Sequence, residues 1–479
     1  MNVETKRYEG YWWFPNNPDK KVTGILSINQ REGIEVKTIG SFLPRHALFG
    51  SQIDLPSQEI LLGQTIDGNS ITLIGINCTN WNSNSDDFSF DLSTSTHSAS
   101  LAIVGKRHFL SKNEVIFSAA EVRFNLLDEW LCKSGFTFKD EHDDRGYPTK
   151  FNLEYKYPEN LEFSIDSIEA KLKTNYVFNR NKTNLQWQQG DKSFLRLTPT
   201  QPQTFDWYLK NFDNLRKFLI VTTGFPISTS EIVGYGDEFY IYTDSDATTK
   251  EQFQIYVKLS NVFLDTVNKH PGELLINLPL LGTELCTVLN TWFQKSEILH
   301  PAVILYVATL SIDLGYSEFR LLNYAQGLEA LHRRVFGGRY LENDKYEPIA
   351  SAIINSIPSD VSRDHRSSLK GRIKYGHEFS QRKRIKLLLD DVWKGCLDEF
   401  IEDKNNFIDK VINTRNYLIH FDPESSSKAV FGTEIFYISE RLKILLITHI
   451  LIQLDIPREN VYRAIKQFNP FIHLKRQIP

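Results

Sequence analysis

The stretch LDEFIEDKNNFIDKVINTRNYLIH, residues 397–420, carries the helical pattern that decides the fold of the second half of the chain. Apolar doublets recur along it at Phe400/Ile401, Phe407/Ile408, Val411/Ile412 and Leu418/Ile419. This spacing places them on one face of an amphipathic helix. Asp422 precedes Pro423, and a residue before proline disfavours the helical conformation, so we expect the helix to end there.

Two residues suited to catalysis lie near the end of this stretch. Arg415 falls within the apolar stripe, and arginine binds phosphate with a planar guanidinium. His420 follows Asn416 by four residues, so Asn416 is placed to orient the imidazole, which transfers protons near neutral pH. Arg415, Asn416 and His420 are therefore a candidate set for cutting RNA without a metal. The alternative is an Arg415 side chain that snorkels at the edge of the core.

The spacing of Arg415 and His420 raises a geometric difficulty. On a regular helix, residues five apart differ by roughly 140° in direction. The two side chains cannot then act on one phosphate from the same face. Either the last helical turn is distorted, or a second chain completes the site.

Glu329 is a candidate supporting residue on another predicted helix, Phe319 to Phe336. Apolar residues and His332 flank it at helical spacings. A carboxylate near a core face needs a cationic partner, and Arg415 is the candidate for that partner. The alternative is a partly exposed glutamate without a role.

The strongest basic segment of the chain is 369–386, with Tyr375 and Phe379 interleaved. This composition favours phosphate contacts with some stacking. The predicted RNA-binding residues are Arg372, Lys374, His377, Arg382, Lys383, Arg384 and Lys386. The alternative is a solvated charged face. Arg372 and His377 repeat the spacing of the catalytic pair, but Gly376 precedes His377 and no apolar stripe supports them, so we interpret them as loop and RNA contact.

The first half of the chain has strand patterns instead. Asp67-Gly68-Asn69-Ser70 is a turn signal between two β-rich runs and predicts a hairpin. One amphipathic helix is expected from Phe205 to Leu219, and an exposed loop from Asn80 to Ser100. The predicted strands are 22–28, 34–39, 60–66, 71–76, 101–104, 115–124, 151–157, 170–178, 238–242 and 252–257.

Helical periodicity dominates after about residue 275. The predicted helices are 281–293, 302–312, 319–336, 382–393, 397–420 and 433–454. The sequence therefore predicts an α+β multidomain protein. A β-rich region covers residues 1–275, with a subdomain break expected near residue 200, and an all-α bundle covers 276–479.

Composition limits the kinds of function. The chain has 479 residues, 41% of them hydrophobic, and a net charge of -4, which excludes a generally basic nucleic-acid-coating protein. The four cysteines are scattered without a CxxC pair, so we expect neither a metal site nor a cofactor. The first residues lack an apolar signal segment, and the run Leu442 to Leu454 is too short to span a bilayer. We therefore expect a cytoplasmic protein without a membrane partner.

The Arg415-Asn416-x-x-x-His420 pattern, on a late helix of a helical domain, resembles the HEPN ribonuclease superfamily. Gln326 to His332 resembles the glutamate-bearing helix of that domain, and Phe379 to Leu389 its middle helix. The segments 9–15 and 22–26, with 64–68 and 71–73, resemble the start of the ApeA-type N-terminal domain. The resemblance to ApeA-like anti-phage defence proteins covers nearly the whole chain.

This resemblance implies a metal-independent endoribonuclease of a bacterial abortive-infection system. HEPN domains typically dimerise, which would place two Arg/His motifs in one cleft. The implied partners are a second copy of the chain, RNA for which tRNA is a suitable candidate, and a phage-encoded trigger sensed through the N-terminal region.

Two other functions stay open. The first is a catalytically silent HEPN domain that dimerises or binds nucleotide, while the N-terminal domain senses a phage product. The second is a carbohydrate-binding β domain, suggested by Trp12, Trp13 and Trp81, although core packing explains these tryptophans better.

Overall fold

The computed structural model describes residues 5–29, 32–40, 42, 59–82, 93–182, 187–240, 248–258, 269–311 and 315–475. The chain divides into two compact units. The first comprises Met1–Arg216 and Ile227–Asn268, and the second comprises Lys217–Pro226 and Lys269–Pro479. Each unit is considered by itself.

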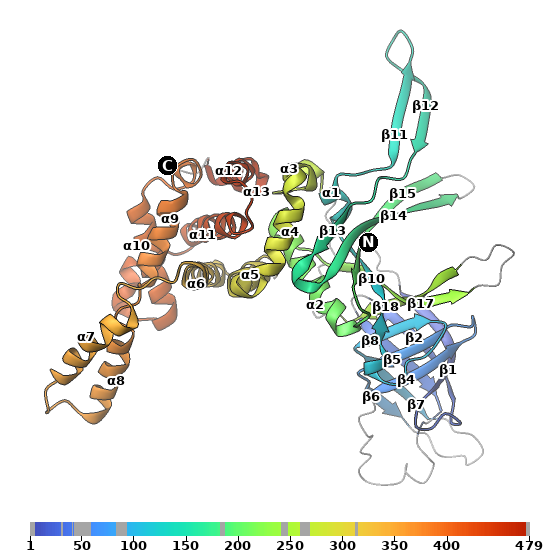
Figure 1. Ribbon diagram of the computed structural model, residues 1–479, viewed down its shortest axis with the longest axis horizontal. Coiled ribbons are helices and arrows are strands. Elements are labelled where there is room, and N and C mark those ends of the chain that lie inside the picture. The colour runs from blue at the N-terminus through green and yellow to red at the C-terminus, as the bar shows by residue number, and fades with distance from the viewer. Residues whose placement is uncertain are drawn as a thin grey trace. The chain divides into compact units, whose positions relative to one another are not determined.

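The first unit is built on a large antiparallel sheet (Figure 1). In the described residues fourteen strands hydrogen-bond in the order β13-β14-β15-β10-β17-β18-β8-β5-β4-β1-β2-β3-β7-β6. Their bounds are β1 Lys6–Trp13, β2 Val22–Asn29, β3 Gly33–Ile39, β4 Ile60–Thr65, β5 Ser70–Ile74, β6 Asn77–Asn82, β7 Thr94–Ala99, β8 Leu101–Gly105, β10 Ala119–Phe124, β13 Glu162–Ile165, β14 Ala170–Lys182, β15 Trp187–Pro199, β17 Thr229–Tyr240 and β18 Thr248–Val257. The β-rich character predicted for this region is confirmed.

Two smaller pairs complete the β structure among the described residues. β9 (Ile116–Phe117) pairs with β16 (Gln203–Thr204). β11 (Phe136–His142) pairs with β12 (Pro148–Tyr155) as a hairpin that extends beyond the sheet of its own unit (Figure 1). Helix α1 (Leu127–Leu131) is short, and α2 (Phe205–Thr223) is the amphipathic helix that the sequence predicts.

The β4–β5 hairpin confirms the turn signal. Ile60 lies opposite Ile74, and the strands are joined at Gly68, whose φ is 75°. Glycine adopts this left-handed conformation without the steric cost of a Cβ atom. The Gly68 amide donates to the Thr65 carbonyl at 3.1 Å and closes the turn.

Two strand predictions need correction. The run predicted as one strand from Val115 to Phe124 is split at Ser118, whose side chain and amide both donate to the carbonyl of Tyr235. The predicted loop from Asn80 to Ser100 contains the end of β6 and all of β7, and its residues 83–92 lie outside the described residues. Threonine and serine side chains of β7 make this strand look polar in sequence although alternate residues are buried. Residues 241–242 of another predicted strand also lie outside the described residues.

Core packing accounts for two of the three tryptophans that suggested carbohydrate binding. Trp12 is fully buried, Trp13 is nearly so, and Trp81 is half-buried on β6. The Trp12 ring lies so close to Gly63 that a Cβ atom there would approach it to 2.3 Å. Such close packing leaves the Trp12 ring no face for a sugar, which favours the core interpretation.

The second unit is a helical bundle, as predicted. Its helices are α3 Leu278–Leu281, α4 Leu285–Gln294, α5 Ser296–Ser311, α6 Ser317–Phe336, α7 Asn343–Asn355, α8 Arg363–Lys374, α9 Gln381–Val392, α10 Lys404–His420, α11 Thr433–Ile452, α12 Arg458–Gln467 and α13 Asn469–Lys475. α11 is apolar on almost every side because it packs against α5, α6, α9 and α10. None of the described helices is both long and apolar enough to cross a membrane.

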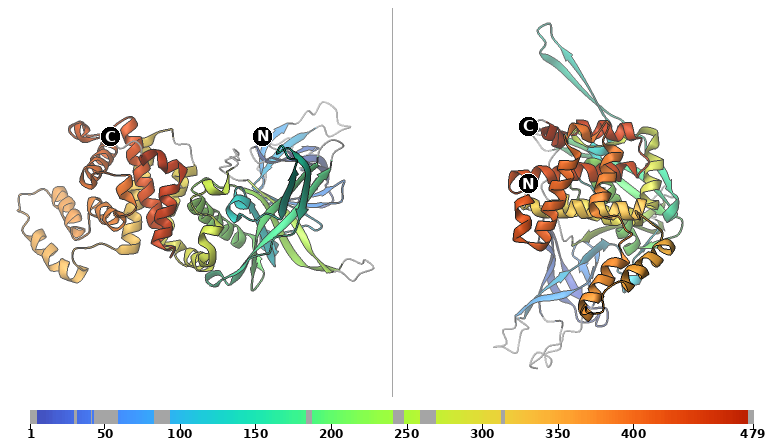
Figure 2. Two further views of the ribbon diagram at one scale, coloured as in Figure 1. Left: turned by 90° about the horizontal axis from the view of Figure 1, so that it is seen from above. Right: turned by 90° about the vertical axis from the view of Figure 1, so that its left-hand side faces the viewer.

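Helices α7 and α8 project from the rest of this unit as a pair (Figures 1 and 2). Neither helix contains a buried residue. Helix α7 is not among the predicted helices, although Tyr346, Ile349 and Ile353 recur at helical spacing; Pro348, which lies inside the helix, is a residue that usually interrupts one. The interpretation of Arg372 as part of a loop is wrong, since Arg372 and Lys374 form the last turn of α8.

Candidate active site

Helix α10 carries the predicted catalytic residues, and its ends are fixed by local chemistry. The Asp403 carboxylate accepts from the amides of Asn405 and Asn406 at 2.8 and 3.2 Å and caps the N-terminus. Such a cap satisfies amides that have no partner within the helix. The predicted start at Leu397 is therefore wrong: Leu397–Glu399 is a separate short 3-10 turn, and Asp403 begins the helix proper.

The last turn of α10 is regular. The helix continues through His420, and the amide of Phe421 donates to the Tyr417 carbonyl at 2.6 Å. A distorted last turn, one of the two expected solutions to the Arg415–His420 spacing, is therefore not found. On a regular helix the two side chains point in different directions, and completion of the site by a second chain stays a prediction.

Arg415 is half-buried, whereas Asn416 and His420 are exposed. The apolar side of α10 is formed by Phe407, Ile408, Val411 and Thr414, which are buried. Arg415 thus lies at the edge of the core, as both the catalytic and the snorkelling interpretations require. Its Nη1 donates to the Asn416 Oδ1 at 3.2 Å. Asn416 therefore supports the guanidinium rather than the imidazole that the sequence suggested.

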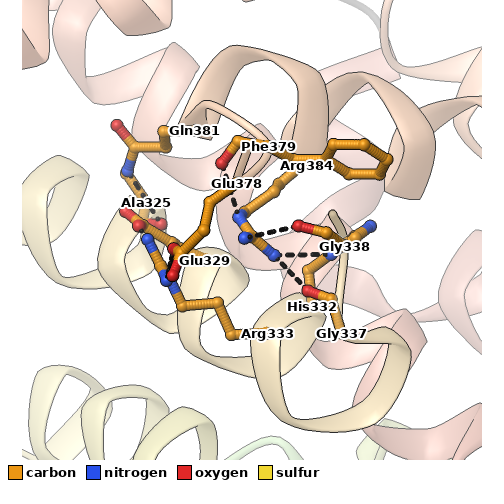
Figure 3. Close-up of polar contacts among 10 residues, drawn as sticks. All are labelled: Ala325, Glu329, His332, Arg333, Gly337, Gly338, Glu378, Phe379, Gln381 and Arg384. Atoms are coloured by element: carbon orange, nitrogen blue, oxygen red, sulfur yellow. Dashed lines mark hydrogen bonds and ion pairs between the residues drawn. The ribbon is translucent and has the colours of Figure 1, made fainter. Parts of the chain in front are cut away.

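Glu329 lies on α6, with its side chain only 16% exposed. The structure contradicts Arg415 as its partner. Arg333, one turn further along α6, donates its Nε to Glu329 at 3.1 Å and pairs through Nη1 with Glu378 (Figure 3). One exposed arginine thus forms ion pairs with two carboxylates, and its contact with Glu329 explains how that carboxylate is tolerated at the edge of the bundle.

Arg384 is a core residue, which corrects its assignment to RNA binding. Its side chain is 1% exposed. Nη1 donates to the Gly337 carbonyl at 2.6 Å, Nη2 to the Gly338 carbonyl at 3.1 Å, and Nε to the Phe379 carbonyl at 3.0 Å (Figure 3). The guanidinium therefore fixes the C-terminus of α6 to the segment before α9. RNA cannot reach it.

His332 is the fourth partner of Arg384. A guanidinium can only donate, so the His332 Nδ1, at 3.1 Å from Nη1, must accept and the ring must be neutral. Burial, reinforced by the charge of Arg384, lowers the pKa of His332 to about 4. Gly338 completes this arrangement: its φ is 96°, and a Cβ there would lie 2.8 Å from Arg384 Nη1.

His377 is also removed from the RNA-binding set. It is buried, stacks on Tyr346 with ring centroids 4.4 Å apart, and its Nε2 lies 2.9 Å from the Asn343 Oδ1. It anchors the base of the α7–α8 pair. The Arg372/His377 pair is therefore not available as a second catalytic pair.

The other five basic residues stay accessible. Arg372, Lys374, Arg382 and Lys386 are exposed and Lys383 is half-buried. Arg382 forms an ion pair with Asp409 of α10, and Lys383 lies over the Phe379 ring. The basic segment thus splits into a solvent-facing set and a core set.

One sequence signal could have separated these sets. Arg384 precedes the buried Ile385, Leu388 and Leu389 of α9 at helical spacings, so it lies within an apolar stripe just as Arg415 does. The Gly337–Gly338 pair marks a helix end, where the last carbonyls have no hydrogen-bond partner within the helix. The sequence does not say which cation would reach them.

Comparison with known families identifies the chain. The model of the ApeA N-terminal domain 1 matches residues 7–292, more than half of the chain. The chain belongs to the ApeA family. The Apea-like HEPN model matches residues 322–460 and includes the helices that carry Glu329, Arg415 and His420. This ApeA architecture confirms the resemblance predicted from sequence and is that of a nuclease-type anti-phage defence protein. No curated protein and no solved structure gave a significant match.

Proposed function

We propose that this ApeA protein is a metal-independent endoribonuclease of a bacterial abortive-infection system. One observation carries the proposal: Arg415 and His420 lie at an accessible end of α10, inside the region that matches the Apea-like HEPN domain. Neither residue is fully buried. Their accessibility suits contact with an external phosphate.

The proposed chemistry is transesterification by the 2'-hydroxyl of RNA. His420 removes the proton from the 2'-oxygen, which attacks the adjacent phosphorus. Arg415, held by Asn416, stabilises the charge that builds on the phosphoryl oxygens. The bond to the 5'-oxygen breaks, and this oxygen takes a proton from the partner subunit's His420 or from water. The products are a 2',3'-cyclic phosphate and a 5'-hydroxyl.

A composite site follows from the divergence of the two side chains on a regular helix. In a twofold dimer, one chain's Arg415 and the other chain's His420 can approach the same phosphate. The five accessible basic residues, Arg372, Lys374, Arg382, Lys383 and Lys386, would then guide the RNA backbone to the cleft. A phage product sensed by the N-terminal domain is the proposed trigger, and tRNA is the first substrate to test.

The decisive experiment is to sequence RNA ends from cells that express the wild type or His420→Ala. We expect new 5'-hydroxyl ends in the wild type only. His473→Ala, an exposed histidine on α13, is the matched control. Arg463→Ala is the control for Arg415→Ala, because Arg463 is an exposed helical arginine that, like Arg415, donates to an asparagine, here Asn460.

The purified protein gives an independent test of the mechanism. Arg415→Ala should lower RNA cleavage by about 100-fold or more. EDTA should leave cleavage unchanged, and DNA should not be cut because it lacks the 2'-hydroxyl. If His420→Ala still protected cells against phage, the silent HEPN alternative would replace this proposal.

A further inference from the structure

Three aromatic side chains converge at the end of α10, where Tyr417 precedes His420 by three residues. The Tyr417 ring contacts Phe421 at a centroid distance of 5.6 Å and Phe431 at 5.3 Å, both edge to face. Phe421 is 67% exposed and Phe431 is 51% exposed. We call these three residues the aromatic platform. An exposed cluster of large apolar side chains is a candidate binding surface.

The fold builds this platform through specific contacts. After α10 the chain forms the short turn η7 (Pro423–Lys428), capped by Asp422. It then returns to α10, where the Val430 amide donates to the buried Thr414 Oγ1 at 3.0 Å. This contact places Phe431 against Tyr417, so the platform is held at both ends rather than formed by a loose loop.

Phe421 holds an unfavourable backbone conformation. It occupies the left-handed region at the end of α10, with φ 50°. Glycine and asparagine are the residues that favour this position, and a bulky side chain is strained there. Such strain concentrates at functional sites, where the side chain serves a purpose other than stability. The ring at position 421 therefore requires an explanation beyond the helix cap.

We propose that the aromatic platform stacks unpaired bases of a single-stranded RNA next to the phosphate at His420. This rests on the proposed function and adds a binding subsite to it. Phe421 follows His420 immediately in the chain, so a phosphate at the imidazole brings the neighbouring base to the rings. Bases stack readily on aromatic side chains whatever their sequence.

The position of the platform beside His420 favours RNA over a second protein surface as the occupant, because Tyr417 and His420 are three residues apart on α10. Arg415 and His420 lie on one side of Phe421 in the chain, and exposed Lys428 lies between Phe421 and Phe431. Protein interfaces are depleted in lysine at their centres. Asp422 and Glu424 offset these cations, so the platform itself is not a basic patch. Its contribution to affinity therefore comes from stacking and depends little on salt.

The test uses the full-length protein and a fluorescent 2'-O-methyl RNA strand that contains 2-aminopurine. Its blocked 2'-oxygen cannot react, so binding is measured without cleavage. The test variant is Phe421→Asn with Phe431→Ser, and asparagine tolerates the left-handed conformation. The control is Tyr316→Asn with Phe319→Ser, which removes a second edge-to-face pair of similar exposure, 67% and 53%.

The platform variant should bind the strand about 10- to 100-fold more weakly at both low and high salt, and should not quench 2-aminopurine. A blunt duplex, whose bases are already stacked, should bind both variants alike. In contrast, Arg372→Ala should weaken binding mainly at low salt. The control double variant should match the wild type, and thermal unfolding should show that each variant is folded.

Two results would overturn the proposal. One is unchanged binding of the strand by the platform variant, or no binding by the wild type. The other is conversion of a dimer to a monomer by the platform variant while strand binding persists, because the surface would then join two copies. Cleavage of natural RNA separates this proposal from the catalytic one. If the platform variant cleaves and binds RNA normally, only the proposed stacking site is contradicted. If the wild type binds RNA through the platform but does not cleave it, only the proposed ribonuclease activity is contradicted.

Discussion

Replacing Arg384 with methionine tests the assignment of this residue to the core. Methionine keeps much of the side-chain length but has no donors, so the carbonyls of Gly337, Gly338 and Phe379 lose their partner. A buried acceptor left unpaired costs about 1–3 kcal/mol. Local relaxation lowers the sum of these three costs. We therefore expect the free energy of unfolding to decrease by about 3–5 kcal/mol, as for other broken buried charge contacts.

This loss should appear as a lower unfolding temperature of the helical unit. For a domain of this size, 1 kcal/mol corresponds to roughly 2–4 °C, so the expected decrease is about 6–20 °C. Hydrogen exchange should accelerate at residues 337–340 and 375–380, where the guanidinium joins the two segments. Arg382→Met is the matched control: Arg382 is 47% exposed and pairs with Asp409 at the surface, so its loss should cost less than about 1 kcal/mol.

The opposite pattern would refute the reasoning. If Arg384→Met unfolded like the wild type and instead weakened RNA binding, the side chain would be an accessible RNA contact after all. Calorimetry of the full-length protein and a binding assay with the same RNA strand distinguish the two results.

Three further predictions concern the same helical unit. The pKa of His332 is about 4, below its ordinary value of 6.5, so the neutral ring stabilises the fold above pH 6.5 and this contribution, roughly 3 kcal/mol at most, is lost as pH falls toward 4. His332→Gln keeps an acceptor for Arg384 and should reduce the loss of stability as pH falls, measured by acid unfolding. Some of this loss will remain, because burial also lowers the pKa of His449. Thr414→Val leaves the Val430 amide unpaired and should cost about 1–3 kcal/mol with faster exchange at residues 428–432, whereas Thr414→Ser should not; equal exchange in both variants would contradict the contact. Asp403→Ala removes the cap of α10 and should lower stability by about 1 kcal/mol in thermal unfolding, with Asp403→Asn close to wild type; an equal loss in both would mean that the carboxylate charge, not the cap, is what matters.

Local patterns in the sequence were sufficient for the β-rich region, the helical bundle and the helix that carries Arg415 and His420. These features depend on short-range physics: alternation along strands, 3.6-residue periodicity, and turn residues such as Gly68. The predicted start of α10 at Leu397 was wrong. The apolar pattern continues across Asp403, but the Asp403 side chain caps the helix and makes it begin there.

Tertiary structure decided which polar side chains face solvent and which are held inside. Arg384 and Arg382 are two residues apart in one basic run, yet Arg384 is enclosed by carbonyls of the distant Gly337–Gly338 segment and of nearby Phe379, and Arg382 is exposed. The pairing of Arg333 with Glu378 and the packing of Phe431 against Tyr417 likewise depend on remote segments, whereas Glu329–Arg333 and Tyr417–Phe421 are i,i+4 pairs that helical spacing allows one to expect. The physical reason is that a charge or ring has many possible partners along a chain, and only packing of remote segments selects one.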